Sequence, residues 1–341
     1  MTAVRRDVSA VKRMIAKPGV PILLFLILLI VVLSVASDQF LTSGNVFAIA
    51  NQSVYVLILA VAMTFVLIGG GIDLSVGSVL GLSGGVAAYL LAHGTPMPLA
   101  FAAALLAGAV MGAINGLVIT KLRVPDFVAT LAMLGIARGV LYVWTNAIPF
   151  RDYMTTTYYT IGGLNRLFWE VTVPIVVALA ATLAGAFALR RTRFGRQVRG
   201  AGSNVEAARL SGVAVDRLKI GVYVLSGTLA AVAGILLAGR LTTVHPEMGT
   251  GYELDAIAAA VMGGAALTGG RGSILGAFVG AVTLTVIQNA INILNVNPYW
   301  ETIITGTVIL VAVIVARASV AVSRPKQAGL APSPSTAQAE A

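Results

Sequence analysis

The sequence predicts an all-α polytopic membrane protein with about ten transmembrane helices, some of them interrupted at discontinuous glycine-rich breaks. Hydrophobic residues make up 58% of the 341 residues and charged residues only 11%, with a mean hydropathy of +0.92. A soluble domain has about 25% charged residues. Long apolar runs also recur along the whole chain, separated by short polar or glycine-rich stretches.

Ten of these apolar runs are candidates for membrane spans, since a transmembrane helix needs about 20 mostly apolar residues. They cover residues 20–36, 46–68, 76–92, 98–120, 127–146, 171–189, 219–239, 253–268, 273–292 and 300–317. The first run follows a basic segment but lacks a small-residue cleavage site, so we expect a retained anchor. The spans define a membrane domain of residues 20–318, preceded by segment 1–19. The Pro-, Ala- and Ser-rich tail 319–341 is expected to be disordered.

The lysines and arginines predict the orientation of these spans. Nineteen lie on one side, before the first span and after the fourth, sixth, eighth and tenth. Only Arg151, Arg166 and Arg240 lie on the other side, and Arg138 falls within a span. The positive-inside rule then places both termini in the cytoplasm. The net charge of +10 therefore indicates topology and contact with anionic membrane lipid, and nucleic-acid binding is not needed to explain it.

Several kinds of active site are hard to build from this composition. The chain has no cysteine and only two histidines, His93 and His245, so neither a metal site nor a histidine-based nucleophilic triad is predicted. None of the five lysines follows a glycine, so the chain encodes no Walker-type phosphate-binding loop. We therefore expect no enzyme and no cofactor in this chain. Uphill transport would need an ion gradient or a separate ATPase.

The stretch "IGGGIDLSVGS" at residues 68–78 interrupts two apolar runs. Glycines weaken a helix, and a membrane helix avoids an ionisable side chain such as Asp73. In one interpretation Asp73 caps the following helix. In the other, a broken helix lines a solute path, because non-helical backbone at membrane depth is tolerated only inside protein or beside water. The two interpretations are compatible, and "GSVLG" at 77–81 recurs as "GSILG" at 272–276.

Further polar residues at membrane level are candidates for this path. The full set of candidate path residues is Asn51, Gln52, Gly70, Gly71, Asp73, Ser75, Ser78, Asn115, Gln288 and Asn289. Uncharged donors and acceptors suit a neutral polyhydroxy solute better than an anion. Each could instead form an interhelical hydrogen bond, worth about 0.6 kcal/mol on average.

The basic loop 190–218 contains a predicted short helix. Ser203 and Glu206 have the spacing of a capping box, and Gly212 is placed to end the helix. Such a helix could lie on anionic headgroups, or it could dock a cytoplasmic partner. The aromatic-rich segment 147–170 is expected outside, as an interfacial belt or a docking surface.

Three stretches carry a specific resemblance. "GGIDLSVGSVLGLSG" at 70–84, "KLRVPDFVATLAMLGIARG" at 121–139 and "AAAVMGGAALTGGRGSILGAFVGA" at 258–281 resemble the ribose-type permease family of bacterial ABC importers, and the similarity runs from about residue 45 to 316. Glu206, Ala207, Ala208 and Gly212 also match the Glu-Ala-Ala-x-x-x-Gly pattern of such permeases. Loop 190–218 would then be a coupling loop.

The resemblance implies a permease subunit that translocates a monosaccharide, such as ribose or a related pentose or hexose, across the inner membrane by alternating access. Its short coupling helix would dock in a groove of a separate ABC ATPase subunit, which would bind ATP and Mg²⁺. A periplasmic sugar-binding protein and a second permease copy would be further partners. The alternative is a gradient-driven secondary transporter of a small neutral polar solute, with Asp73, Asp255 or Glu301 cycling protons, but that model gives the short helix no purpose.

Overall fold

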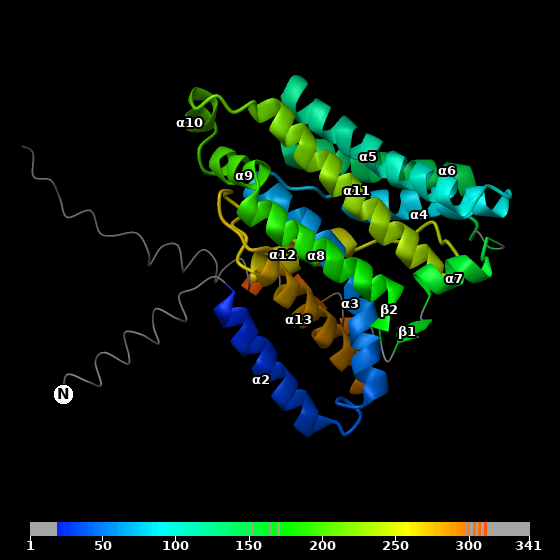
Figure 1. The fold of residues 1–341 in the computed structure, drawn as a ribbon. Coiled ribbons are helices and arrows are strands. Elements are labelled where there is room, and N and C mark those ends of the chain that lie inside the picture. The colour runs from blue at the N-terminus through cyan, green and yellow to red at the C-terminus, as the bar shows by residue number, and fades with distance from the viewer. Residues whose placement is uncertain are drawn as a thin grey trace, which may run out of the picture.

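A computed structural model of the chain describes residues 19–311, except positions 150, 152, 164, 169–170, 298, 301–302, 305 and 308–309. The predicted disordered tail and nearly all of segment 1–19 lie outside the described residues. The described part is mostly α-helical (Figure 1). Its only described strands form one short antiparallel hairpin.

The elements follow one another along the chain in this order. The first half contains α2 (Val20–Ala36), α3 (Ser43–Ile68), α4 (Val76–Ala92), α5 (Met97–Lys121), α6 (Asp126–Thr145), α7 (Thr156–Gly162), β1 (Arg166–Phe168) and β2 (Val171–Thr172). The second half contains α8 (Val173–Arg191), α9 (Arg193–Ser203), α10 (Val205–Leu210), α11 (Val215–Leu241), α12 (Tyr252–Met262) and α13 (Ile274–Ile293).

Six described helices are long and apolar enough to cross a membrane, namely α3, α5, α6, α8, α11 and α13. The shorter apolar helices α2 and α4 coincide with the predicted spans 20–36 and 76–92. The predicted span 253–268 is only partly helical, because α12 ends at Met262. The predicted span 300–317 lies largely outside the described residues. The chain is thus a polytopic helical membrane protein, and the count of ten spans stays a prediction.

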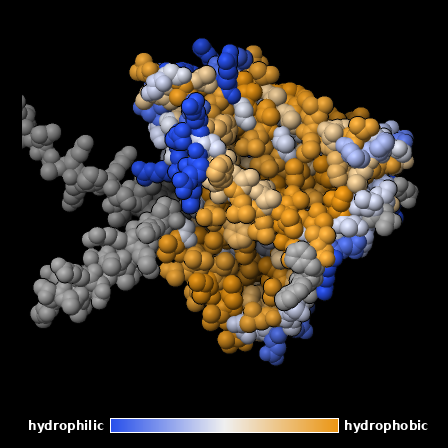
Figure 2. All heavy atoms as spheres, in the orientation of Figure 1, coloured by the Kyte–Doolittle hydropathy of each residue, from blue (hydrophilic) through white to orange (hydrophobic). Residues whose placement is uncertain are grey.

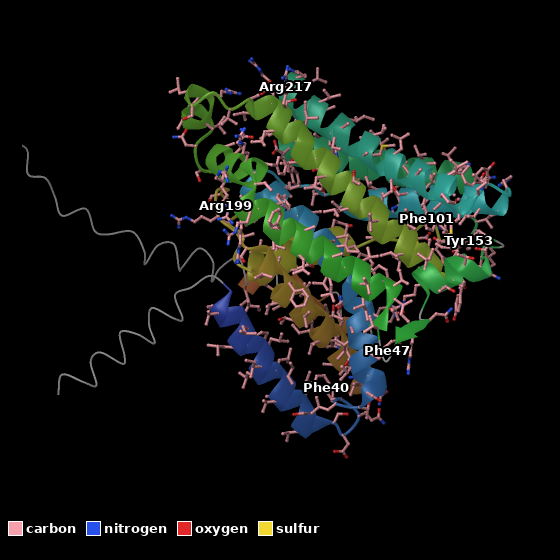
Figure 3. The ribbon with its side chains drawn as sticks, viewed as in Figure 1. Phe40, Phe47, Phe101, Tyr153, Arg199 and Arg217 are labelled. Atoms are coloured by element: carbon pink, nitrogen blue, oxygen red, sulfur yellow. The ribbon has the colours of Figure 1, made fainter. Side chains whose placement is uncertain are left out.

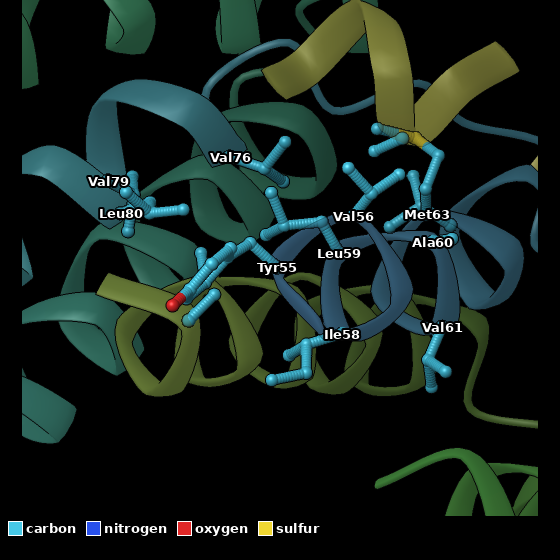
Figure 4. Packing of buried hydrophobic residues seen from close by; sticks show 14 of the residues in the cluster. Tyr55, Val56, Ile58, Leu59, Ala60, Val61, Met63, Val76, Val79 and Leu80 are labelled. Atoms are coloured by element: carbon cyan, nitrogen blue, oxygen red, sulfur yellow. The ribbon is translucent and has the colours of Figure 1, made fainter. Parts of the chain in front are cut away.

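Helix α11 lies at the centre of the helical bundle and packs against α3, α4 and α5. Its close contacts are made through glycines. A Cβ atom added at Gly108 or Gly112 of α5 would overlap the backbone carbonyls of Gly227 and Tyr223 in α11. Small residues let helix backbones approach closely in a membrane, where apolar burial between helices contributes little. Beside this crossing, Tyr55, Ile58 and other α3 side chains pack in the core near α4 (Figure 4).

The two ends of the molecule differ in composition. Arg199 and Arg217 lie at the end that carries α9, α10 and the start of α11, whereas Phe101 and Tyr153 lie at the opposite end (Figure 3). We call these the basic end and the aromatic end. Between them, hydrophobic residues cover the broad face formed by α2, α8 and α13 (Figure 2). This is the surface expected for a protein surrounded by lipid.

Part of the aromatic segment packs onto the bundle instead of standing free. Tyr153 and Tyr158 are buried, and their hydroxyl groups donate to the carbonyl oxygens of Ala238 (2.9 Å) and Ile235 (2.7 Å) in α11. Gly162 of α7 lies against Gly239 so closely that a Cβ on either would collide with the other. These residues therefore anchor the aromatic end of α11, which neither predicted role for the segment included.

Candidate translocation and coupling site

The first glycine break ends α3 through a Schellman motif. Gly70 has a φ of 79°, a left-handed conformation that glycine adopts without a steric penalty. Its N–H donates to the carbonyl of Leu67 (2.9 Å), and the N–H of Gly71 donates to that of Val66 (3.0 Å). These two bonds satisfy carbonyls left free at the helix end. The predicted helix break at this position is thus confirmed.

The second break repeats this design. Gly264 ends α12 with a φ of 91°, and its N–H donates to the carbonyl of Val261 (2.9 Å). The N–H of Ala265 donates to the carbonyl of Ala260 (2.9 Å), which completes another Schellman motif. The residues that follow, 266–273, contact the end of α9 at Gly202 and Ser203 and lead into α13. The similar stretches "GSVLG" and "GSILG" therefore each follow a break, and in both cases the helix before the break ends in a Schellman motif.

Helix α9 lies between the two breaks. A Cβ atom at Gly202 would overlap the carbonyl oxygen of Ile68 and lie 2.8 Å from the nitrogen of Gly270. The N–H of Gly270 donates to the same Ile68 carbonyl (2.8 Å). A Cβ at Gly269 would lie 3.1 Å from the Cα of Gly70. We call Gly70, Gly202, Gly269 and Gly270 the glycine junction, because three distant segments meet there with backbone on backbone.

Asp73 is buried beside this junction, with 1% of its surface exposed. Its Oδ1 accepts from the backbone N–H (3.0 Å) and hydroxyl (2.6 Å) of Ser75, and its Oδ2 accepts from the hydroxyl of Ser226 in α11 (2.7 Å). Asn115 of α5 donates to the Ser75 hydroxyl (2.9 Å), and Ser78 donates to the Ser75 carbonyl (3.1 Å). The network connects the break to α4, α5 and α11.

This geometry corrects the predicted cap of α4. The helix begins at Val76, and the N-cap position belongs to Ser75, whose side chain makes no capping bond. Asp73 holds the N–H of Ser75 one residue earlier. It therefore stabilises the turn that enters α4, and its second oxygen accepts from Ser226 of α11, a donor that the sequence did not indicate.

A partly buried ion pair lies under the break. Lys219 of α11 and Asp126 of α6 are 3.3 Å apart, and the hydroxyl of Tyr223 donates to Asp126 (3.2 Å). A Cβ at Gly71 would overlap both the Asp126 carboxylate and the Tyr223 hydroxyl. These residues, together with Gly69, line a small pocket between the break, α9 and α11. Gly71 is thus required for the close fit of the break onto α6 and α11.

Helix α10 begins one residue later than the predicted capping box. Its N-cap is Asn204, whose side-chain oxygen accepts from the N–H of Ala207 (3.0 Å). Ser203 is instead the last residue of α9 and donates to the carbonyl of Arg199 (2.8 Å). Glu206 pairs with Arg209 (3.3 Å). The predicted Ser203–Glu206 box is therefore wrong, because asparagine is as strong an N-cap as serine and stands next to it.

The predicted end of this helix is confirmed. Gly212 has a φ of 80° and donates to the carbonyl of Arg209 (2.9 Å), while Val213 donates to that of Ala208 (3.0 Å). This Schellman motif turns the chain directly into α11. Ala208 is buried against the neighbouring turns, whereas Glu206 and Ala207 are exposed. Helix α10 lies at the basic end (Figure 1), and its Leu210 side chain is 89% exposed.

The remaining candidate path residues bond elsewhere. Asn51 accepts from Thr172 (2.7 Å), Gln288 donates to Asp255 (3.4 Å), and Asn289 exchanges hydrogen bonds with Asn45. Gln52 is half-buried in α3. These bonds join α3 to β2, α13 to α12 and α13 to α3, and the role of the four residues in a solute path stays a prediction. The sequence did not point to Ser226, Tyr223 or Gly202. It did show Arg138 within a predicted span, and a charged residue at such a position often marks a functional site.

Comparison with known proteins now identifies the family. A family model described as "Branched-chain amino acid transport system / permease component" matches residues 45–313. The chain belongs to this family. It is therefore a permease component and not an enzyme, with ATP hydrolysis assigned to a separate subunit of the transport system.

This permease has close relatives in several bacteria. It is 43% identical to the ribose import permease protein RbsC of Escherichia coli over 295 residues, which are 86% of this chain and 92% of that protein. It is 38% identical to RbsC of Bacillus subtilis, over 86% and 90% of the two chains. It is 34% identical to the L-arabinose permease AraH of Azospirillum brasilense, over 90% and 89%. The resemblance to ribose-type permeases is confirmed along nearly the whole membrane region.

Proposed function

We propose that this permease is the membrane subunit of a bacterial ABC importer that carries a monosaccharide, ribose or a related pentose or hexose, into the cell. The names of the relatives support the sugar class. The observation that carries the coupling mechanism is the position of α10. It is exposed at the basic end, and its N-cap Asn204 follows two residues after Gly202, which is packed between both glycine breaks.

The mechanism follows from that position. A separate ATPase subunit, which holds ATP and Mg²⁺, binds α10 and moves it when the ATPase dimer closes. Because Gly202 contacts the backbone at Ile68 and Gly270 directly, α9 passes the displacement to both breaks. The Asp73 network then carries it into α4 and α11. The membrane path thereby changes the side on which it is open.

The partners and the topology belong to the same proposal. A second copy of this permease completes the membrane path, and a periplasmic sugar-binding protein delivers the solute to the aromatic end. Ten spans cross the inner membrane, and the basic end and both termini lie in the cytoplasm. The charge distribution of nineteen basic residues on one side against three on the other supports this orientation.

Uptake in the bacterium that carries the gene tests the solute class. A deletion strain and the same strain with the gene restored are given labelled D-ribose, D-glucose or L-leucine in separate assays, and unlabelled D-xylose, L-arabinose, D-galactose and L-leucine are added as competitors of sugar uptake. We expect gene-dependent uptake that a pentose or hexose inhibits and leucine does not. Gene-dependent uptake of leucine without any sugar would contradict the proposal.

A further inference from the structure

The connection between α11 and α12 runs deep into the bundle. Residues 244–249 leave the aromatic end of α11 and run along α4, antiparallel to that helix. Val244 lies near Gly85, Met248 near Gly84 and Gly81, and Gly249 against Gly77. Gly77 is 15 residues before the end of α4 at Ala92, so Gly249 is about 22 Å from that end at 1.5 Å per residue. The hydrocarbon core is about 30 Å thick, so this backbone lies at membrane depth.

The glycines of α4 make this approach possible. A Cβ at Gly77 would overlap the carbonyl oxygen of Gly249, and one at Gly81 would lie 2.5 Å from the carbonyl oxygen of Met248. Gly77 and Gly81 therefore leave a groove without side chains on α4, in which a non-helical backbone lies against the helix. This gives the glycine pattern of α4 a purpose beyond helix packing.

Arg138 of α6 holds the segment in place. Its Nη1 atom donates to the carbonyl oxygens of Pro246 (2.7 Å) and Met248 (2.8 Å). Glu247 and Glu253 are close enough to interact electrostatically with the guanidinium group. Glu253 in turn accepts from the N–H of Gly251 (3.2 Å). A non-helical segment inside a membrane needs such partners, because water does not satisfy its backbone there.

The side chains of this segment alternate between two environments. Val244, Pro246 and Met248 are buried, whereas His245, Glu247 and Thr250 are exposed. The segment follows successive turns, in which the N–H of Met248 donates to the carbonyl of His245 (2.9 Å) and that of Thr250 to the carbonyl of Glu247 (3.0 Å), and one of its faces lies on the protein. Its free face carries an imidazole, a carboxylate and a hydroxyl at a depth where exposure to hydrocarbon is costly. Non-helical backbone with such a face is stable only beside water or protein.

We propose that the polar edge formed by His245, Glu247 and Thr250, next to Arg138, lines a water-filled path within the membrane and binds the hydroxyl groups of the transported solute. That this solute is a neutral sugar rests on the proposed function. The Glu247 carboxylate accepts charge-assisted bonds from hydroxyl groups, which are stronger than neutral ones. Two carboxylates beside one arginine also disfavour an anion such as a sugar phosphate.

Cysteine labelling tests the path without reference to the solute. The chain has no native cysteine, so Glu247→Cys and Thr250→Cys can each be reacted with a charged, membrane-impermeant methanethiosulfonate in the assembled transporter. Leu183→Cys is the control, because Leu183 is 66% exposed within the apolar helix α8. We expect rates at least about tenfold above the control, since the reactive thiolate forms in contact with water. Labelling rates as low as that of the control would overturn the path. Such low rates are what a second copy covering this edge would produce.

Uptake kinetics test the binding role. Glu247→Gln removes the charge and keeps the shape, and the control Asp38→Asn alters an exposed carboxylate in the connection between α2 and α3. We expect Glu247→Gln to raise the KM for labelled sugar about tenfold, the loss of one charge-assisted bond, and Asp38→Asn to leave it unchanged. An unchanged KM in both would overturn solute binding by Glu247. Absence of any sugar uptake by the unaltered protein would instead refute the proposed function, while the labelling result would still decide the path.

Discussion

At the scale of single residues, Asp73 works as a hydrogen-bond acceptor. It receives three hydrogen bonds from Ser75 and Ser226 within the buried network. In Asp73→Asn one oxygen still accepts from Ser75, and the Ser226 hydroxyl can reverse its role and accept from the new amide. We therefore expect Asp73→Asn to retain most of the transport.

Asp73→Ala should lower transport more than Asp73→Asn. It leaves buried donors unsatisfied, which costs about 1–3 kcal/mol each. Labelled-sugar uptake, corrected for the amount of each variant in the membrane, measures the difference. A carboxylate that cycles protons in a gradient-driven transporter would make the asparagine variant as inactive as the alanine variant, and that outcome would contradict the acceptor role.

Gly70 and Gly71 are required for different physical reasons. A Cβ atom at Gly70 would make only an ordinary contact, 3.9 Å from the Cα of Gly202, but Gly70 has a φ of 79°, which costs an L-residue about 1–2 kcal/mol. Asparagine tolerates this conformation better than valine does, so Gly70→Asn should transport better than Gly70→Val.

Gly71 has no positive φ, and a Cβ there would collide with Asp126 and Tyr223. Gly71→Ala should therefore already impair transport, whereas Gly70→Ala should do so less. Comparison of uptake by the four variants checks the assignment. Equal activity of Gly70→Val and Gly70→Asn would show that backbone conformation is not the constraint at residue 70.

At the scale of elements, α9 and α10 form the proposed coupling unit. The pair Glu206–Arg209 is exposed, and such pairs contribute about 0–1 kcal/mol. Glu206→Ala should therefore leave the fold intact and weaken ATPase binding or solute-stimulated ATP hydrolysis.

Gly212→Val should be more severe than Glu206→Ala, because residue 212 has a positive φ in the Schellman motif that ends α10. Co-purification with the ATPase and assay of ATP hydrolysis measure both variants. Wild-type coupling in both would contradict the role of α10.

Two glycines of α9 offer a matched comparison of the glycine junction. A Cβ at Gly202 would overlap the Ile68 carbonyl, whereas nothing lies within 4 Å of a Cβ at Gly200. Gly202→Ala should force α9 away from the breaks and abolish sugar uptake while the ATPase still binds. Gly200→Ala should transport normally and stabilise the helix by up to about 1 kcal/mol. Normal uptake in Gly202→Ala would show that contact with the breaks is not needed.

The sequence predicted the glycine breaks correctly but misplaced the start of α10 and the end of α12. Glycine pairs at the ends of apolar runs predicted the breaks, because glycine is the residue that takes the left-handed helix-end conformation. The start of α10 was misplaced, since Ser203 and Asn204 are neighbouring residues of equal capping strength. Residues 263–268 were assigned to a span because they are apolar, although Gly264 already turns the chain.

The polar segment 244–250 could not be placed from sequence. Its composition is that of a surface loop, and its depth depends on the glycine groove of α4 and on Arg138 of α6. These contacts join parts of the chain that are more than a hundred residues apart. The same reason applies to Ser226, whose bond to Asp73 spans 153 residues.

At the scale of the whole molecule, the basic and aromatic ends should face opposite sides of the inner membrane. Single cysteines at exposed Val205 in α10 and exposed Asn165 near β1 test this, since the chain has no native cysteine. An impermeant maleimide added outside should label residue 165 in intact cells and residue 205 only after the membrane is opened. Labelling of residue 205 from outside would reverse the proposed topology.

The account's central claim is that a separate ATPase, acting on α10, drives transport through the glycine junction. Sealed vesicles containing the purified transporter and its binding protein test it most directly, with labelled sugar on the aromatic side and ATP on the basic side. We predict uptake that requires ATP, persists when ion gradients are collapsed, and is lost in Gly202→Ala but not in Gly200→Ala. Sugar uptake driven by an imposed ion gradient without ATP would contradict the claim.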